Sequence, residues 1–230
     1  MSGDPLALLA DARVRGVLER LYTEAQQQLP RLLLHYLPHV PKLLMGRALS
    51  FPEESITGFY ADKSLPLEPG QAAFIYLTAR ALRAELIVEF GTSFGISTLW
   101  LAAAVRAKGR GRVIATELVP EKAARAQAHF EEAGLAEWIE LRVGDARETL
   151  LEVPDGIDLF LNDGFAPLAL ELLQRLAPHM REGGMVVTDN VGTFPGNYRD
   201  YLAYLDDASN GFEATVPPYK SGTSYAVRLA

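Results

Sequence analysis

The chain has 230 residues, of which 49% are hydrophobic and none is cysteine, and its formal net charge at pH 7 is −7. This length supports one large core with an appended segment, and the absence of cysteine excludes disulfides, zinc–thiolate sites and cysteine nucleophiles. The negative charge argues against a nucleic-acid partner, because nucleic-acid-binding surfaces need clustered Lys and Arg.

The first 62 residues predict a helical extension. Asp4 before Pro5 is a typical helix start, and apolar residues follow at helical spacing, at Val14, Leu18, Leu21 and Ala25. Prolines, histidines and charged residues interrupt residues 29–45, so this segment predicts short helices rather than the ~20 apolar residues of a membrane span. We expect a lid or a homodimer interface here, no membrane partner and, because Met1–Pro5 lacks a basic export signal, a cytoplasmic location.

Residues 63–230 predict one α/β domain. Strands are expected at 86–90, 112–117, 138–143, 157–161 and 185–188, and helices at 71–83, 99–105, 121–133, 167–176 and 198–208. Residues 212–216 and 224–229 read as a terminal hairpin. Strands that alternate with helices in this way are typical of a doubly wound parallel sheet.

The junction between the first strand and the next helix predicts a ligand site. Gly91 and Gly95 let a ligand approach the backbone closely, and the first turn of the helix offers free N–H groups. A dinucleotide fingerprint would need glycine where Ser93 and Ile96 stand, and no Gly-Lys-Ser or Gly-Lys-Thr exists for a P-loop. NAD and P-loop nucleotide binding are thus excluded, while a purely structural turn remains an alternative.

Every predicted parallel strand ends in a polar residue. In doubly wound sheets ligands bind beyond the carboxyl ends of the strands. The residues at these ends are Glu89, Glu117, Asp145, Asp163, Asp189 and Asn190. A single one is weak evidence, since polar residues are common where strands meet loops, but the whole set predicts a ligand-binding edge.

The glycine junction resembles the first motif of class I S-adenosylmethionine-dependent methyltransferases, an acidic-x-Gly-x-Gly-x-Gly pattern met by Glu89, Gly91 and Gly95 with Ser93 in the middle. From about residue 65 the chain is similar to O-methyltransferases of the catechol and caffeoyl-CoA type (O-methyltransferase family 3-like). The matching segments are 88–97, 116–117, 144–146, 158–164, 188–191 and 200–204. The resemblance implies a Rossmann-like fold, with a seven-stranded mostly parallel sheet, an antiparallel last strand and helices on both faces.

The resemblance also implies a cofactor site for S-adenosylmethionine, with S-adenosylhomocysteine as product. Glu89 would accept from the amino group of the methionine moiety, Glu117 from the ribose hydroxyls, and Asp145 with Ala146 would lie beside adenine. The full implied set is Leu67, Glu89, Gly91, Thr92, Ser93, Ser97, Glu117, Asp145, Ala146 and Asp163.

By the same resemblance, Asp163, Asp189 and Asn190 would bind a divalent cation, which gives Asp163 a metal-assisted catalytic role. Carboxylate and amide oxygens are hard ligands that suit Mg²⁺. Such an ion would orient neighbouring oxygens of an acceptor and lower the pKa of the attacking hydroxyl. The alternative for Asp189 and Asn190 is a turn-forming pair at a strand end.

The chain departs from these relatives where they carry the lysine that serves as general base, because Ala166 stands there, followed by Pro167. Ser224 replaces a glutamate that contacts the acceptor in the catechol branch. The proton acceptor is left open among Lys220, Tyr219, metal-bound hydroxide and bulk water.

We predict an S-adenosylmethionine-dependent O-methyltransferase that acts on a hydroxyl of a small aromatic or catechol-like acceptor. Two alternatives stay open. One is a metal-independent methyltransferase of the same fold with a different acceptor. The other is a non-catalytic ligand-binding domain that has lost the usual base.

Overall fold

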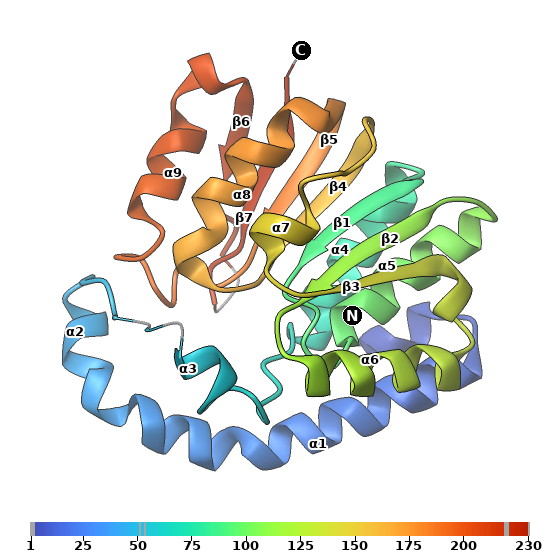
Figure 1. Cartoon of the computed structure of the whole chain (residues 1–230), viewed down its shortest axis with the longest axis horizontal. Helices are drawn as coiled ribbons and strands as arrows, with labels where there is room; N and C mark the ends of the chain where they lie inside the picture. Colours follow the sequence, from blue (N-terminus) through green and yellow to red (C-terminus); the bar gives the residue numbers. More distant parts are fainter. Residues whose placement is uncertain (1–2, 51, 53, 219–220, 230) are drawn as a thin grey trace.

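The computed structural model describes residues 3–50, 52, 54–218 and 221–229. Within them a seven-stranded sheet has the order β3-β2-β1-β4-β5-β7-β6 and carries helices on both faces (Figure 1). The strands are β1 Leu86–Phe90, β2 Arg112–Glu117, β3 Ile139–Val143, β4 Ile157–Asn162, β5 Met180–Thr188, β6 Phe212–Thr215 and β7 Ser224–Arg228. β1 to β5 pair in parallel, whereas β7 is antiparallel to β5 and β6. The predicted fold class is confirmed.

Two hydrophobic clusters fill the space between the sheet and its helices. Alternate strand residues point to opposite faces, so Ile87 belongs to one cluster and Val88 to the other. The first cluster lies under α1 (Ala12–Tyr36), α4 (Pro69–Ala81), α5 (Ile96–Lys108) and α6 (Pro120–Ala133). The second lies under α7 (Ala146–Thr149), α8 (Ala169–Leu176) and α9 (Arg199–Asp206). The domain therefore has three layers.

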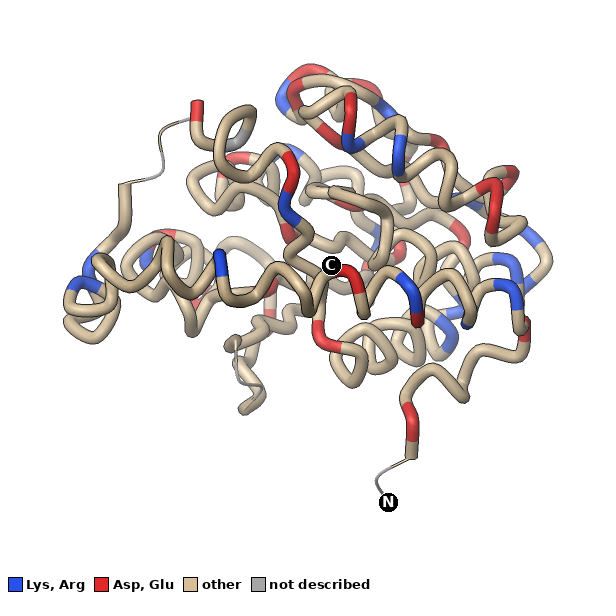
Figure 2. Tube along the Cα trace, turned by 90° about the horizontal axis from the view of Figure 1, so that it is seen from below, with Lys and Arg blue, Asp and Glu red and all other residues tan. Residues whose placement is uncertain are grey.

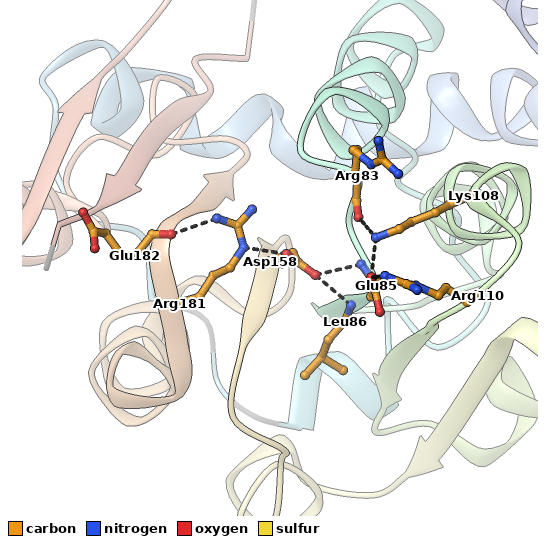
Figure 3. A network of polar contacts seen from close by, with 8 residues as sticks. All are labelled: Arg83, Glu85, Leu86, Lys108, Arg110, Asp158, Arg181 and Glu182. Atoms are coloured by element: carbon orange, nitrogen blue, oxygen red, sulfur yellow. Dashed lines mark hydrogen bonds and ion pairs between the residues drawn. The ribbon is translucent and has the colours of Figure 1, made fainter.

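The strand order reverses at β1, which pairs with β2 on one side and β4 on the other. The chain leaves these neighbouring strands toward opposite halves of the sheet, so their carboxyl ends border a crevice. At the opposite end the strand starts are tied together (Figure 3). Asp158 accepts hydrogen bonds from the N–H groups of Glu85 and Leu86 at 2.7 and 3.0 Å and from Arg181 Nε at 2.6 Å. Glu85 in turn pairs with Arg110 at 2.6 Å.

β5 differs from the prediction because it begins at Met180 rather than Met185. Gly183 and Gly184 were expected to precede the strand, but they lie inside it, and Gly183 has φ +73°. The register between β4 and β5 shifts between Ile157 and Leu159 at this level. Such a β-bulge inserts extra residues without ending the strand, and glycine accommodates it.

The predicted helix start at Asp4–Pro5 is a four-residue 3-10 helix, Pro5–Leu8. α1 begins only after Asp11, whose side chain caps it. The helix then continues through Pro30, which is exposed. Two short helices follow, α2 (Val40–Leu44) and α3 (Glu54–Thr57). Of the described helices, none is long and apolar enough to cross a bilayer.

The two halves of α1 have different environments. Val14, Leu18 and Tyr22 belong to the first core cluster, and Tyr22 Oη accepts a hydrogen bond from Trp100 Nε1 at 3.3 Å. From the second half of α1 to the residue after α2, seven apolar side chains are exposed, namely Leu29, Leu33, Leu34, Leu37, Val40, Leu44 and Met45. Residues 25–50 contain no Asp or Glu, so this stretch of the trace carries blue but no red in Figure 2. The homodimer through this segment stays a prediction, as does the boundary at residue 62.

We expect Leu18→Ala to lower the free energy of unfolding by about 2–5 kcal/mol, because it leaves a cavity in a core that the sheet shares with α1. Leu18 is fully buried, whereas Leu33 on the same helix is 69% exposed. The matched control Leu33→Ala should change stability by about 0.5 kcal/mol or less. Urea unfolding of both variants measures this difference. Equal, small losses would show that α1 is not part of the core.

Candidate functional site

The turn between β1 and α5 touches the end of β4. Gly91 has φ +98°, and a Cβ built on it would lie 2.6 Å from both the Asp163 carbonyl oxygen and the Gly164 Cα. Ser93 also has positive φ, +51°, at the position where a glycine is usual, and its N–H donates to Glu117 Oε2 at 2.7 Å. A left-handed conformation costs a non-glycine residue about 1–2 kcal/mol, so the Glu117 hydrogen bond helps to hold a strained turn.

Gly95 closes the turn and is the N-cap of α5. A Cβ on Gly95 would come 2.4 Å from Phe130 Cε1, so glycine lets α6 approach closely. No side chain caps α5 here, which leaves N–H groups of its first turn available to a ligand. A small hollow of about 10 Å³ lies beside this turn, and the predicted cofactor residues that line it are Leu67, Gly91, Thr92, Ser93, Ser97 and Asp163.

Glu89 is fully buried beneath the turn. Its Oε2 accepts hydrogen bonds from the hydroxyls of Thr92, at 3.2 Å, and Thr98. Its Oε1 has no hydrogen-bond partner among the described residues. Burial raises the pKa of this carboxyl above its usual value, while the hydroxyls of Ser97, Thr98 and Thr92 act against the shift. A buried oxygen without a partner is costly in a folded protein, and a bound donor would satisfy it.

Glu117 and Asp145 end the next two strands. Glu117 is buried, and besides the Ser93 N–H it accepts the Val119 N–H at 2.9 Å. Asp145 caps α7 and pairs with Arg147, whose Nη2 lies 2.6 Å from Asp145 Oδ2. Hydrogen bonds and charge from Arg147 lower the pKa of Asp145. Both carboxylates are therefore fixed in position along the same edge of the sheet.

A cavity of about 290 Å³ opens beyond the carboxyl ends of the strands. The predicted site residues that line it are Gly91, Ser93, Glu117, Asp145, Ala146, Asp163 and Asn190. With the hollow beside α5, the structure thus gathers along one groove every predicted cofactor residue except Glu89, which lies beneath it. Lys220 and Tyr219, two of the proposed proton acceptors, lie outside the described residues. Ser224 is buried in β7 and is not among the residues that line the cavity.

The three predicted metal ligands have unequal positions. Asp163 and Asn190 line the cavity, and Asn190 has φ +65°. Asp189 is buried, and its Oδ1 accepts from Gln71 Nε2 at 2.6 Å and from Ser221 Oγ at 2.7 Å. Burial and the charges of Asp189 and Glu89 raise the pKa of Asp163 well above its usual value. Among the described residues no group of three or more His, Cys, Asp or Glu is placed to hold a metal ion.

The structure adds residues that the sequence did not point to. Tyr36 and Tyr60 reach the cavity from the N-terminal extension, and Phe194 and Tyr198 from the segment after β5. Lys122 lines it from α6, with Nζ 3.4 Å from Ser93 Oγ. No local pattern marks these side chains, because only the fold brings them to the strand ends.

Comparison with known proteins shows which proteins this chain resembles. Residues 88–191 match a family described as a methyltransferase domain. The chain is 34% identical over 142 residues to a catechol O-methyltransferase of Niastella koreensis and 36% identical over 140 residues to one of Mycobacterium tuberculosis. These alignments cover 59% and 60% of this chain and 63% and 60% of the relatives, so the chain spans about three-fifths of their length.

Solved structures show the same fold. A cofactor-bound protein from MTB has a TM-score of 0.68 at 26% identity, and the match covers 74% of this chain and 85% of that one. The O-methyltransferase TomG from Streptomyces achromogenes, in complex with SAM, has a TM-score of 0.65 at 25% identity, with 79% and 92% covered. Residues 88–191 therefore match a methyltransferase domain, and the predicted resemblance to class I S-adenosylmethionine-dependent methyltransferases is confirmed.

We expect the ligand-free protein to lose stability as pH rises, in part because of Glu89. A carboxyl whose pKa is raised in the folded state contributes stability that is full below its unfolded pKa and is lost as pH rises through the folded pKa. Glu89→Gln removes this loss, so its stability relative to wild type should increase from about pH 5 to about pH 8.

Urea unfolding without ligand at both pH values measures this change. The exposed Glu121 on α6 provides the control, and Glu121→Gln should follow the wild-type pH dependence. A Glu89→Gln variant that keeps the wild-type pH dependence would show that Glu89 does not carry it.

Proposed function

We propose that this chain, through the methyltransferase domain that it contains, transfers a methyl group from S-adenosylmethionine to a hydroxyl of a small aromatic or catechol-like acceptor. The observation that carries the proposal is the buried Glu89 Oε1, which has no partner among the described residues and lies under a glycine turn at the end of a 290 Å³ cavity. The SAM-bound O-methyltransferase of the same fold supports the cofactor. The relatives named catechol O-methyltransferase support the acceptor.

In this proposal the groove holds the cofactor from end to end. Glu89 accepts from the ammonium of the methionine moiety, and N–H groups at the start of α5 receive its carboxylate. Glu117 accepts from the ribose hydroxyls with the lone pairs that the Ser93 and Val119 N–H groups leave free. Ala146, which is buried at the start of α7, packs beside adenine.

The other half of the cavity would receive the acceptor. Apolar and aromatic side chains that line the cavity, and that this arrangement leaves to an acceptor, are Tyr60, Phe165, Leu168, Phe194 and Tyr198. S-adenosylmethionine supplies a methyl group on a positively charged sulfur. The chain's part is to hold the acceptor oxygen in line with that carbon and to keep water out, which converts an encounter into a near-attack geometry.

The proposal predicts that Glu117→Ala weakens binding of S-adenosylhomocysteine roughly tenfold or more, because a hydrogen bond to a charged group contributes about 1.5–3 kcal/mol. Titration calorimetry measures the affinity, and Glu121→Ala on the exposed side of α6 is the matched control. Wild-type protein that binds neither S-adenosylmethionine nor S-adenosylhomocysteine at millimolar concentration would refute the function. Binding without transfer to any phenol would favour the non-catalytic alternative.

We also propose a divalent cation, Mg²⁺ or a similar ion, held by Asp163, Asp189 and Asn190. The charges support it, because the pKa of Asp163 is raised by burial and also by the like charges of Asp189 and Glu89, which a cation would relieve. The donors are hard oxygens, although Oδ1 of Asp189 already accepts from Gln71 and Ser221. When bound, such an ion would polarise the acceptor hydroxyl and lower its pKa.

The metal proposal predicts that EDTA abolishes methyl transfer to catechol and that added Mg²⁺ restores it. Asp189→Ala should lower kcat about 100-fold or more, at the lower end of what one catalytic group contributes, while affinity for S-adenosylhomocysteine stays within about twofold. The measurement uses labelled methyl donor with and without chelator. Transfer that is unchanged by EDTA and in Asp189→Ala would establish the metal-independent alternative.

A further inference from the structure

We propose that Lys122 is a further cofactor-binding residue, and that its ammonium group and the Glu117 carboxylate together select a ligand by the neighbouring hydroxyls of a ribose. This inference rests on the proposed function and adds to it a hydrogen-bond donor that the resemblance does not supply. Lys122 stands in the first turn of α6, the helix that follows β2, and it lines the cavity.

The ammonium group of Lys122 is buried without an ion pair. The residue is 8% exposed, and within the described part of the chain no carboxylate oxygen lies within 4.0 Å of Nζ. Among the described residues, its one side-chain hydrogen bond is the 3.4 Å contact with Ser93 Oγ. The centroid of the Phe94 ring lies 5.4 Å from Nζ. An ammonium group has three N–H donors, so two of them are left for a ligand.

This placement is unfavourable for a lysine. A buried ammonium group that lacks an ion pair loses hydration, and a cation in the first turn of a helix faces the positive end of the helix dipole. Burial lowers the pKa of Lys122, the negative charges of Glu117 and Asp62 act against this shift, and Lys63 adds to it. Asp62 pairs with Lys63, and its side chain is 70% exposed. Glu117 is therefore the buried negative charge that faces Lys122.

Ser93 holds the two side chains next to each other. Its N–H donates to Glu117 Oε2 at 2.7 Å, and its Oγ accepts from Lys122 Nζ. Because Ser93 stands where the resembling motif has a glycine, the acceptor for Lys122 exists only through this chain's own side chain. The turn between β1 and α5 thus fixes a carboxylate and an ammonium group on one wall of the cavity.

The two groups have opposite hydrogen-bonding roles. Lys122 only donates, and Glu117 only accepts, with the lone pairs that the N–H groups of Ser93 and Val119 leave free. Glu117 would repel an anionic ligand group that approached Lys122, and Lys122 would repel a cationic group that approached Glu117. A hydroxyl satisfies both, because it donates to one and accepts from the other. Two neighbouring hydroxyls, as in ribose, therefore fit this wall better than a charged group does.

The test uses titration calorimetry with two ligands, S-adenosylhomocysteine and its 2′,3′-dideoxyribose analogue, which lacks both hydroxyls and keeps the rest of the molecule. We expect wild type to bind S-adenosylhomocysteine about a hundredfold more tightly than the analogue. The reason is that the analogue leaves both Glu117 and Lys122 without a partner, and a hydrogen bond to a charged group contributes about tenfold or more.

Lys122→Met keeps the length of the side chain and removes its donors. It should weaken binding of S-adenosylhomocysteine about tenfold or more and change binding of the analogue less than about threefold, so the discrimination between them falls. Lys122→Arg keeps a charged donor and should retain most of the discrimination. The matched control is Arg125→Met, which removes a half-exposed cation of the same helix that does not line the cavity. It should leave both affinities unchanged.

Failure of the proposed function and failure of this inference are distinguishable. Wild type that binds neither S-adenosylmethionine nor S-adenosylhomocysteine would refute the function itself. If wild type binds S-adenosylhomocysteine, discrimination that stays at the wild-type level in Lys122→Met overturns the inference alone, whether that variant loses both ligands equally or neither.

Stability without ligand separates a ligand-binding role from a structural one. Because Lys122→Met removes a buried ammonium group that has no described ion pair, the variant should be at least as stable as wild type in urea unfolding. A clear loss of stability would assign Lys122 to the fold, as a partner of Glu117, and would overturn the inference.

Discussion

The site depends on the close contact between the carboxyl ends of β1 and β4. The register pairs Phe90 with Asn162, and the N–H of Asp163 donates to the carbonyl of Phe90 at 3.0 Å. The residue after β1 is Gly91, where a Cβ would have no room against Asp163. The loops that follow β1 and β4 are therefore in contact where they leave the sheet, and they diverge beyond that point. Asp163 lines the cavity between them, and Glu89 lies buried beneath the turn at Gly91.

Buried carboxyl groups have different surroundings at the two ends of the sheet. At the strand starts, Asp158 is satisfied by two backbone N–H groups and by Arg181. At the carboxyl ends, Glu89 keeps an oxygen without a described partner, and burial together with nearby negative charge raises the pKa of Asp163. Buried groups with perturbed pKa values are typical of functional sites. The hydrogen bonds of Asp158 hold the strand starts together, whereas the carboxyl end keeps a buried oxygen that a ligand could satisfy.

The sequence was informative where structure is set locally. The period of apolar residues and the glycine and proline positions predicted the strands of the sheet, and the polar residues at strand ends pointed to residues that line the cavity. It failed where distant contacts decide. Gly183 and Gly184 form a bulge because β4 pairs across them, and Tyr36 and Tyr60 reach the cavity only because α1 and the segment after α3 fold over it. Neither outcome has a local signature.

Two features of the cavity lining are uncharged: Ala166, which stands where a lysine was expected, and the hydrogen-bonded pair Tyr36 and Tyr60. Ala166 lines the cavity with a methyl group where related enzymes would place a cation. Ala166 therefore offers no charge to a ligand at this point of the cavity, whereas the hydroxyls of Tyr36 and Tyr60, which also line it, can offer neutral hydrogen bonds. Some residues that line the cavity, such as Glu117 and Asp145, stand at strand ends, whereas others, such as Tyr36 and Phe194, belong to the extension and to a loop. Changes in the extension can therefore alter the lining of the cavity without disturbing the turn at Gly91, since residues on connecting segments vary more freely than the elements that carry them.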